Sequence, residues 1–463
     1  MRAARALFAL AFGLWLAALA GEGFERWVAA TELPALASET SVEVLDRNGR
    51  LLRAYTVADG RWRLHAEPGS VDPLFLHMLL AYEDKRFYRH HGVDPLAVLR
   101  AAGQALWHGR VVSGASTLTM QVARLIEDGP TGTLAGKLRQ VRLALALERR
   151  LGKEGVLALY LDRAPYGGNV EGVRAAARAW FGKPPARLTP AEAALLVALP
   201  QSPETRRPDR HPEAARAARQ RVLARAVAAG VIGAEVAATA ARAPVPQERA
   251  PMPRLAPHLA DRLRADTPHA PVLLTTIDAE LQARLERLAA RAVGDGGESG
   301  LSIAMVVADH RSGEILASVG SAGYAAGPGQ GYVDMTRALR SPGSTLKPLV
   351  YALAFDEGLA HPQTIIDDRP MRFGTYAPTN FDGRFHGPLS AEKALQLSLN
   401  IPVVALAAEL GPARVMAALR RAGVRAALPA DAAPGLAVVL GGVGVSAEGL
   451  ATLYAGLAEG GRA

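Results

Sequence analysis

The stretch Tyr82-Glu83-Asp84-Lys85-Arg86-Phe87-Tyr88-Arg89-His90-His91-Gly92 gathers acidic, basic and aromatic side chains directly after an expected helix. Asp72 and Pro73 predict the N-cap and first residue of that helix, which continues to Glu83. A carboxylate at a helix C-terminus lies against the negative end of the macrodipole, which disfavours its charged form. Glu83 is therefore a candidate general base, although the cluster also fits an ordinary solvated helix end.

The spacing Glu-Asp-x-x-Phe-x-x-His-x-Gly is met by Glu83, Asp84, Phe87, His90 and Gly92. It resembles the first motif of glycosyltransferase family 51, the peptidoglycan glycosyltransferases. Residues 114–121, Gly-Ala-Ser-Thr-Leu-Thr-Met-Gln, resemble the second motif, in the Thr-Met-Gln form typical of class A penicillin-binding proteins of the 1C type. Two motifs in order are more specific than either alone.

The resemblance implies an all-α, lysozyme-like domain that polymerises lipid II into glycan strands, inverts the anomeric carbon and releases undecaprenyl pyrophosphate. A sugar hydroxyl is a poor nucleophile, so a carboxylate must accept its proton, and Glu83 would be that base. Taken alone, Ser116, Thr117 and Gln121 fit a helix N-terminus with polar capping as well as substrate contact. The resemblance places substrate contacts at Asp84, Phe87, His90, Ser116, Thr117, Gln121, Lys137, Arg139, Gln140 and Glu148.

The third motif departs from the family pattern Arg-Lys-x-x-Glu, because Gly136 replaces the Arg and Gln140 replaces the Glu. Gln can form hydrogen bonds but carries no charge. Glu148 lies about 80° further around the expected helix and is the carboxylate that we expect to substitute in part. Lys137, Arg139 or a divalent cation (Mg²⁺ or Mn²⁺) would stabilise the leaving pyrophosphate. The sequence requires no other cofactor and assigns no metal ligands.

The composition and the N-terminal segment limit the protein's compartment and partners. The chain has 463 residues, no Cys and a net charge of +9, and its length allows two or three domains. Arg2 and Arg5 precede the apolar run from Ala6 to Ala20, which predicts a single-pass anchor in the cytoplasmic (inner) membrane with the rest of the chain on the periplasmic side. A cleaved signal peptide that ends at Ala18-Leu19-Ala20 is the alternative. Because the basic part of the chain is expected to be exported, we do not expect nucleic acid to be its partner.

The segments that follow differ in composition and pattern. The run from Leu96 to Val112 is apolar, which fits either a core helix or, by the resemblance, a segment that approaches the bilayer. We expect an anchor over residues 1–27, a β connector over 40–68 with a hairpin at Asn48-Gly49, the glycosyltransferase domain over 69–243, a Pro-rich linker over 244–271 and a transpeptidase-like domain over 272–463.

Ser344-Thr345-Leu346-Lys347 is the candidate acylation site of the last domain. Ser and Lys three residues apart share a helix face, so a buried neutral Lys347 would accept the Ser344 proton. Ser390 and Lys393 have the same spacing, but we expect Ser390 to cap a helix. Ser398-Leu399-Asn400 extends the resemblance to the serine transpeptidases, an α/β (α+β), β-lactamase-like fold in which β-lactams are possible ligands.

The third transpeptidase motif, Lys-Thr-Gly, is absent, and the sequence stops at Ala463 before the remaining strands of such a sheet. That strand helps to form the oxyanion hole, so we expect an incomplete domain that is poor or inactive in transpeptidation. The expected partners are lipid II, the nascent glycan strand, the membrane and other cell-wall synthesis proteins. A lysozyme-like glycan-cleaving enzyme and a non-catalytic scaffold that binds lipid II are the rival functions.

Overall fold

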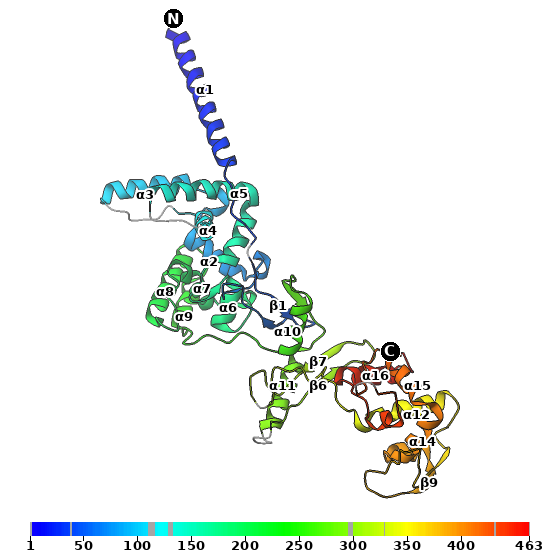
Figure 1. Ribbon diagram of the computed structural model, residues 1–463. Helices are drawn as coiled ribbons and strands as arrows, with labels where there is room; N and C mark the ends of the chain where they lie inside the picture. Colours follow the sequence, from blue (N-terminus) through cyan, green and yellow to red (C-terminus); the bar gives the residue numbers. More distant parts are fainter. Residues whose placement is uncertain are drawn as a thin grey trace. The chain divides into compact units, whose positions relative to one another are not determined.

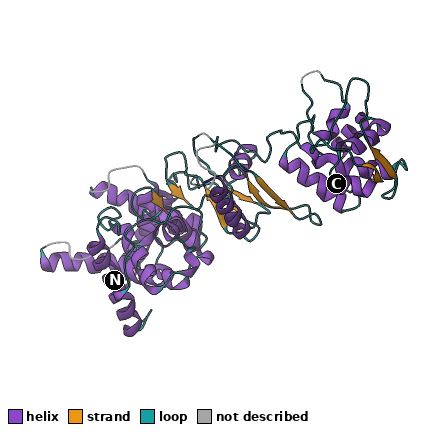
Figure 2. Ribbon diagram, turned by 90° about the horizontal axis from the view of Figure 1, so that it is seen from below, coloured by secondary structure: helices purple, strands orange, loops and turns teal. Residues whose placement is uncertain are grey.

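The computed structural model describes residues 2–37, 39–109, 116–127, 133–294, 300–327, 329–429 and 432–462. The chain separates into two compact units. Unit 1 contains Met1–Glu43 and Ala54–Pro253, and unit 2 contains Val44–Arg53 and Arg254–Ala463. Helices dominate both units, and the strands are short (Figure 2).

Unit 1 is helical, as predicted for the first domain (Figure 1). The two-residue strands β3 (Trp62–Arg63) and β4 (Val170–Glu171) pair in parallel and tie the segment before α2 to the segment after α5. The helices of this unit are α1 (Arg2–Ala29), α2 (Pro73–Glu83), α3 (Pro95–His108), α4 (Leu118–Ile126), α5 (Leu134–Arg163), α6 (Val173–Phe181), α7 (Pro190–Ala198), α8 (Pro212–Ala228) and α9 (Ala234–Arg242).

Three helices begin at a capping side chain followed by Pro, and one of these starts, at Asp72, is predicted by the sequence. The Asp72 side chain accepts a hydrogen bond from Leu74 N, and the Asp94 side chain accepts one from Leu96 N. Thr189 forms a capping box with Glu192. Each cap satisfies backbone N–H groups that have no partner within the helix, which fixes the first turn.

The core of unit 1 holds α2 rigidly. α2 packs against α7 and α8, and Phe75, Met78 and Leu79 on α2 are completely buried. Burial of one such side chain contributes roughly 1.5–3 kcal/mol. Glu83, the last residue of α2, therefore lies at the end of a helix that is anchored in the core.

The N-terminal helix α1 contacts α5 near its C-terminal end. Arg142 Nε donates a hydrogen bond to Trp27 O at 2.9 Å, and the Arg142 guanidinium lies over the Trp27 ring. Arg149 and Glu25 form an ion pair at 2.8 Å. Earlier along the helix, Phe12, Leu14 and Trp15 are exposed.

No single helix among the described residues is both long enough and apolar enough to cross a membrane. The two consecutive helices Asn400–Leu410 and Pro412–Arg421, which are bent by 86° relative to each other, are together long and apolar enough, by length and composition only.

Unit 2 combines small sheets with helices. The hairpin predicted at Asn48-Gly49 is present, and its strands β1 (Glu43–Leu45) and β2 (Leu51–Ala54) join β5 (Val272–Leu274) in the order β2-β1-β5. Two further antiparallel pairs are β6 (Met305–Ala308) with β7 (Ile315–Val319) and β8 (Ile365–Asp368) with β9 (Gly387–Ser390). The helices are α10 (Pro257–Asp266), α11 (Ala279–Gly294), α12 (Lys347–Asp356), α13 (Ala391–Gln396), α14 (Asn400–Leu410), α15 (Pro412–Arg421) and α16 (Ala447–Ala458).

Two features of unit 2 bear on the expected domain limits. Helix α10 lies inside the range 244–271 that was expected to be a linker, because Pro257 occupies its first position, which tolerates proline. A hydrophobic core forms around α12, α14 and α15, with Leu346, Val350, Val404 and Leu419 completely buried. An incomplete transpeptidase fold stays a prediction.

Candidate active site

A cleft of about 600 Å³ opens beside the C-terminal end of α2 in unit 1. Most of its lining is polar or charged, which suits a hydrophilic substrate. The lining side chains are Tyr82, Glu83, Asp84, Lys85, Arg86, Asp94, Ala97, Arg100, Ser116, Thr117, Gln121, Gln201 and Arg225.

Glu83 is half-buried in this cleft and is held by two side-chain amides. Gln121 Nε2 donates to Glu83 Oε2 at 2.8 Å, and Gln201 Nε2 donates to Glu83 Oε1 at 2.8 Å. Burial raises the pKa of Glu83, while the two hydrogen bonds and the charges of Arg225 and Arg206 oppose this shift. The sequence suggested the helix macrodipole as the cause of a raised pKa, whereas the structure gives desolvation as the main one. Glu83 is thus suited to accept a proton.

The other side chains of the first motif are buried. His90 Nε2 lies 3.0 Å from both Asp84 carboxylate oxygens, and Asp84 also accepts a hydrogen bond from Leu118 N at 3.0 Å. Phe87 is 1% exposed and meets His90 edge-on. Of these predicted contact residues, Asp84 lines the cleft, and Phe87 and His90 do not.

The second motif lies at the start of α4. Thr117 is the N-cap of α4, where its Oγ1 accepts a hydrogen bond from Met120 N and donates one to Gly92 O at 2.6 Å. Ser116 Oγ accepts a hydrogen bond from Lys137 Nζ at 2.7 Å. The capping interpretation is therefore confirmed for Thr117, and both side chains still line the cleft. Gly114 and Ala115 of this motif, and Val111 and Val112 of the apolar run, lie outside the described residues.

The third motif lies on α5, and its side chains are not among those that line the cleft. Lys137 reaches the cleft through Ser116, and burial together with the nearby charge of Arg124 lowers the Lys137 pKa. Arg139 forms an ion pair with Glu127 at 2.7 Å. Gln140 is buried.

Glu148, the candidate replacement carboxylate, is engaged elsewhere. Its Oε2 accepts a hydrogen bond from Thr119 Oγ1 at 2.9 Å, and its Oε1 lies 2.6 Å from Lys153 Nζ. Lys153 returns to Glu148 across a break in α5 at Gly152, whose φ of 66° and ψ of −175° are not helical. The structure therefore does not bring Glu148 to Glu83.

Sequence reasoning missed several lining residues. Gln201 follows α7 in a 3-10 turn, and Arg225 lies on α8, where its guanidinium covers the Tyr82 ring. The segment from Leu188 to Pro203, which resembles a fifth motif of the family, includes Gln201, whereas nothing local pointed to Arg225. Lys85 and Arg100 form no ion pair among the described residues, whereas Arg86 pairs with Asp94 at 3.2 Å. The cleft therefore combines one proton acceptor with available positive charge.

Three of the candidate acylation residues, Lys347, Ser398 and Asn400, meet in unit 2. Lys347 is buried, and its Nζ donates to Asn400 Oδ1 at 2.7 Å and to Ser398 Oγ at 3.2 Å. Burial lowers the Lys347 pKa to about 8. Ser344 is exposed in the 3-10 turn η5 (Gly343–Leu346), directly before α12. Ser390 Oγ accepts a hydrogen bond from Lys393 N, which confirms the predicted helix cap.

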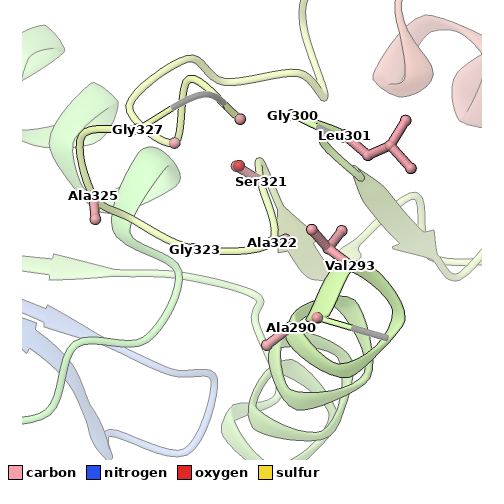
Figure 3. A pocket seen from close by; sticks show the side chains of 12 residues that line it. Ala290, Val293, Gly300, Leu301, Ser321, Ala322, Gly323, Ala325 and Gly327 are labelled. Atoms are coloured by element: carbon pink, nitrogen blue, oxygen red, sulfur yellow. The ribbon is translucent and has the colours of Figure 1, made fainter. Parts of the chain in front are cut away.

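A second hollow of about 670 Å³ lies near the C-terminal end of α11 in unit 2 (Figure 3). Its described lining consists of small and apolar residues, with Ser321 as the one polar side chain. Without a titratable group, this lining offers no acid, base or nucleophile comparable to Glu83.

Within the described ranges, no group of three His, Asp or Glu side chains is arranged to hold a metal ion. In the cleft, Asp84 and Asp94 are already bound to His90 and Arg86. Binding of a divalent cation stays a prediction, and no step of the proposed reaction uses it.

Comparison with known proteins identifies both units. The family model "Transglycosylase" matches residues 48–227, and the model "Penicillin binding protein transpeptidase domain" matches residues 303–462. Penicillin-binding protein 1C of Escherichia coli is 44% identical over 91% of this chain and 54% of its own length. Penicillin-binding protein 1F of Bacillus subtilis is 30% identical over 89% of this chain and 59% of its own length.

Penicillin-binding protein 1B of Vibrio cholerae is 31% identical over 78% of this chain and 49% of its own length. The chain thus spans about half to three fifths of the length of these curated relatives. A transglycosylase domain followed in one chain by a transpeptidase domain is the combination that the motifs indicated. On this evidence the chain belongs to the class A penicillin-binding proteins.

Proposed function

We propose that the chain is a peptidoglycan glycosyltransferase that polymerises lipid II into glycan strands and releases undecaprenyl pyrophosphate. The observation that carries this proposal is the Glu83 carboxylate, held by two amides in a cleft where Lys85 and Arg100 form no ion pair with a described residue. A half-buried carboxylate with a raised pKa suits general base catalysis. The transglycosylase match over the same residues supports it.

In the proposed reaction, Glu83 accepts the proton of the acceptor sugar's 4-hydroxyl as the new bond to the anomeric carbon forms. The bond from that carbon to the pyrophosphate breaks at the same time, and its electron pair leaves with the pyrophosphate. Lys85 and Arg100, with Lys137 at the edge of the cleft, stabilise the negative charge that develops there.

A single displacement inverts the anomeric centre. A retaining mechanism needs a second carboxylate about 5 Å from the first. Gln140 carries no charge, and Glu148 is paired with Lys153, which favours inversion.

A lipid-linked substrate is consistent with a protein anchored in the inner membrane. The exposed apolar side chains Phe12, Leu14 and Trp15 of α1 support a single-pass anchor in the inner membrane, with the catalytic domain over residues 69–243 on the periplasmic side. An anchored cleft would meet a lipid-linked sugar at the membrane surface. The nascent glycan strand and other cell-wall synthesis proteins are the further partners proposed.

A second activity, acylation of Ser344 by a peptide or a β-lactam, is favoured by one observation. The lowered Lys347 pKa, about 8, leaves part of this side chain neutral near pH 7 and able to accept the Ser344 proton.

The test of the proposed function is polymerisation of labelled lipid II in detergent by the purified chain, with products separated on a gel. Long glycan is expected from the wild type and from Glu213→Gln, a control at an exposed α8 position, and none from Glu83→Gln. Binding of lipid II without polymer would favour a scaffold. Release of muropeptides from sacculi would instead indicate a lysozyme-like enzyme.

A further inference from the structure

The Gln201 side chain connects Glu83 to a second layer of residues. Its Nε2 donates to Glu83 Oε1 at 2.8 Å, while its Oε1 accepts from Arg206 Nη1 at 3.1 Å. Arg206 is itself anchored, because the same Nη1 donates to Ala198 O at 2.7 Å, near the C-terminal end of α7. The chain of contacts therefore runs from the end of α7 through Arg206 and Gln201 to Glu83.

Arg206 determines which end of the Gln201 amide faces Glu83. A guanidinium can only donate hydrogen bonds, so the amide oxygen must face Arg206 and the amide nitrogen must face the carboxylate. The Tyr82 hydroxyl, 3.4 Å from the same Gln201 oxygen, favours this orientation as well. A reversed amide would place its oxygen against a carboxylate, which repels it.

We propose that Gln201, oriented by Arg206, is a positioning residue that keeps Glu83 ionised and correctly aimed for the glycosyl transfer step. This inference rests on the proposed glycosyltransferase function and adds to it a named support for the base. The Gln201 amide donates a hydrogen bond to Glu83 but carries no charge. It therefore stabilises the Glu83 anion without the strong loss of basicity that an ion pair would cause.

The arrangement leaves room for the substrate. An ionised carboxylate offers about four lone-pair sites, and the amides of Gln121 and Gln201 use one on each oxygen. The remaining sites can accept the acceptor hydroxyl. Gln201 is exposed and lines the cleft, so a glycan chain bound there would exclude water from its bond to Glu83 and strengthen it.

The experiment compares kcat/KM and KM for lipid II polymerisation from pH 5.5 to 8.5 in the wild type and in Gln201→Leu, Gln201→Glu, Arg206→Leu and Arg206→Lys. Gln201→Leu removes a donor to a charged group, and a loss on the order of ten-fold at pH 6 is expected. The loss should shrink as the pH rises, because Glu83 then ionises without help. KM should change little.

Gln201→Glu separates this role from a purely structural one. The two side chains have nearly the same shape, so a packing role predicts a milder effect for Glu than for Leu. Repulsion between two carboxylates predicts a larger loss for Glu than for Leu at pH 6. Arg206→Leu should lose activity with the same pH dependence, and Arg206→Lys, which retains a donor, should recover most of it. Gln220→Leu at an exposed α8 position is the matched control.

The outcomes distinguish a failure of the Gln201 proposal from a failure of the proposed glycosyltransferase function. If the wild type makes glycan, and the Gln201 variants lose activity equally at all pH values or not at all, the inference is wrong and the proposed function stands. If the wild type makes no glycan, the proposed function fails first, and the inference fails with it. A larger defect in Gln201→Leu than in Gln201→Glu would also overturn the positioning role.

Discussion

The Nε2 atom of His90 lies 3.0 Å from each carboxylate oxygen of Asp84, and both side chains are buried. The same carboxylate accepts a hydrogen bond from the backbone of Leu118, the first residue of α4. One acidic side chain therefore joins the loop after α2 to α4, which carries Gln121. Its contacts fit a role in holding the two sides of the cleft together.

Replacement of Asp84 by Ala is expected to lower the free energy of unfolding by about 1–3 kcal/mol, because it leaves His90 Nε2 and Leu118 N–H buried without an acceptor. Urea unfolding of the purified protein measures this. Glu213→Ala, at an exposed position, should change stability by no more than about 0.5 kcal/mol. An Asp84→Ala protein of unchanged stability without activity would place Asp84 on the substrate instead.

The rate of glycan polymerisation should fall as the pH is lowered through the raised pKa of Glu83. The base must be ionised to accept a proton, and burial shifts its ionisation above the range of an exposed Glu. The loss should therefore begin at a higher pH than an unperturbed carboxylate would give. Initial rates between pH 4.5 and 8, on protein shown by circular dichroism to stay folded, test this. A rate that is level down to pH 4.5 would exclude burial as the dominant influence.

Substitution of Gly92 by Ala should destabilise unit 1 more than substitution of Gly230 by Ala. Both residues have positive φ, 81° and 72°, which costs an L-residue about 1–2 kcal/mol. A Cβ at Gly92 would also lie 2.7 Å from Ala144 O in α5, whereas a Cβ at Gly230 would meet nothing within 4 Å. The close approach should add roughly 1–3 kcal/mol.

Thermal unfolding of the two Gly variants gives the comparison. Equal melting temperatures would mean that α5 moves away to admit the methyl group, and that this contact does not fix the distance between α5 and the first motif.

Any acylation of Ser344 should accelerate as the pH rises through about 8. Lys347 has its pKa lowered to about 8 by burial, and only its neutral form can accept the Ser344 proton. Labelling with a fluorescent penicillin at pH 6, 7, 8 and 9 measures this. Ser344→Ala should abolish the label and Ser390→Ala should not, since Ser390 caps α13. Label retained by Ser344→Ala would locate the nucleophile elsewhere.

The parts that the sequence predicts well are set by neighbours along the chain. Asp72 and Ser390 start helices because their side chains bond to backbone groups two or three residues away. The motif spacing likewise selects Glu83 and Gln121. Gln201 and Arg206 escape prediction because they reach Glu83 only through tertiary packing, from beyond α7.

Glu148 shows a different limit of sequence reasoning. Its angular position on an ideal helix predicted that it would partly replace the missing carboxylate, whereas in the structure it pairs with Lys153. The break at Gly152 brings Lys153 back to Glu148. The pairing of β1 with β5 in the sheet β2-β1-β5 could not be predicted either, because neither strand has a local sequence pattern that indicates which strand it pairs with.

That sheet also governs the order in which the protein can be assembled. β1 and β2 leave the ribosome early, but the strand that pairs with β1 follows only after the whole stretch from Tyr55 to Pro271. At 5–20 residues per second, this delay is on the order of tens of seconds. During that time β1 presents an unpaired edge, while unit 1 is itself being synthesised. Unit 2 is therefore completed last, and the loop that its sheet closes contains most of unit 1.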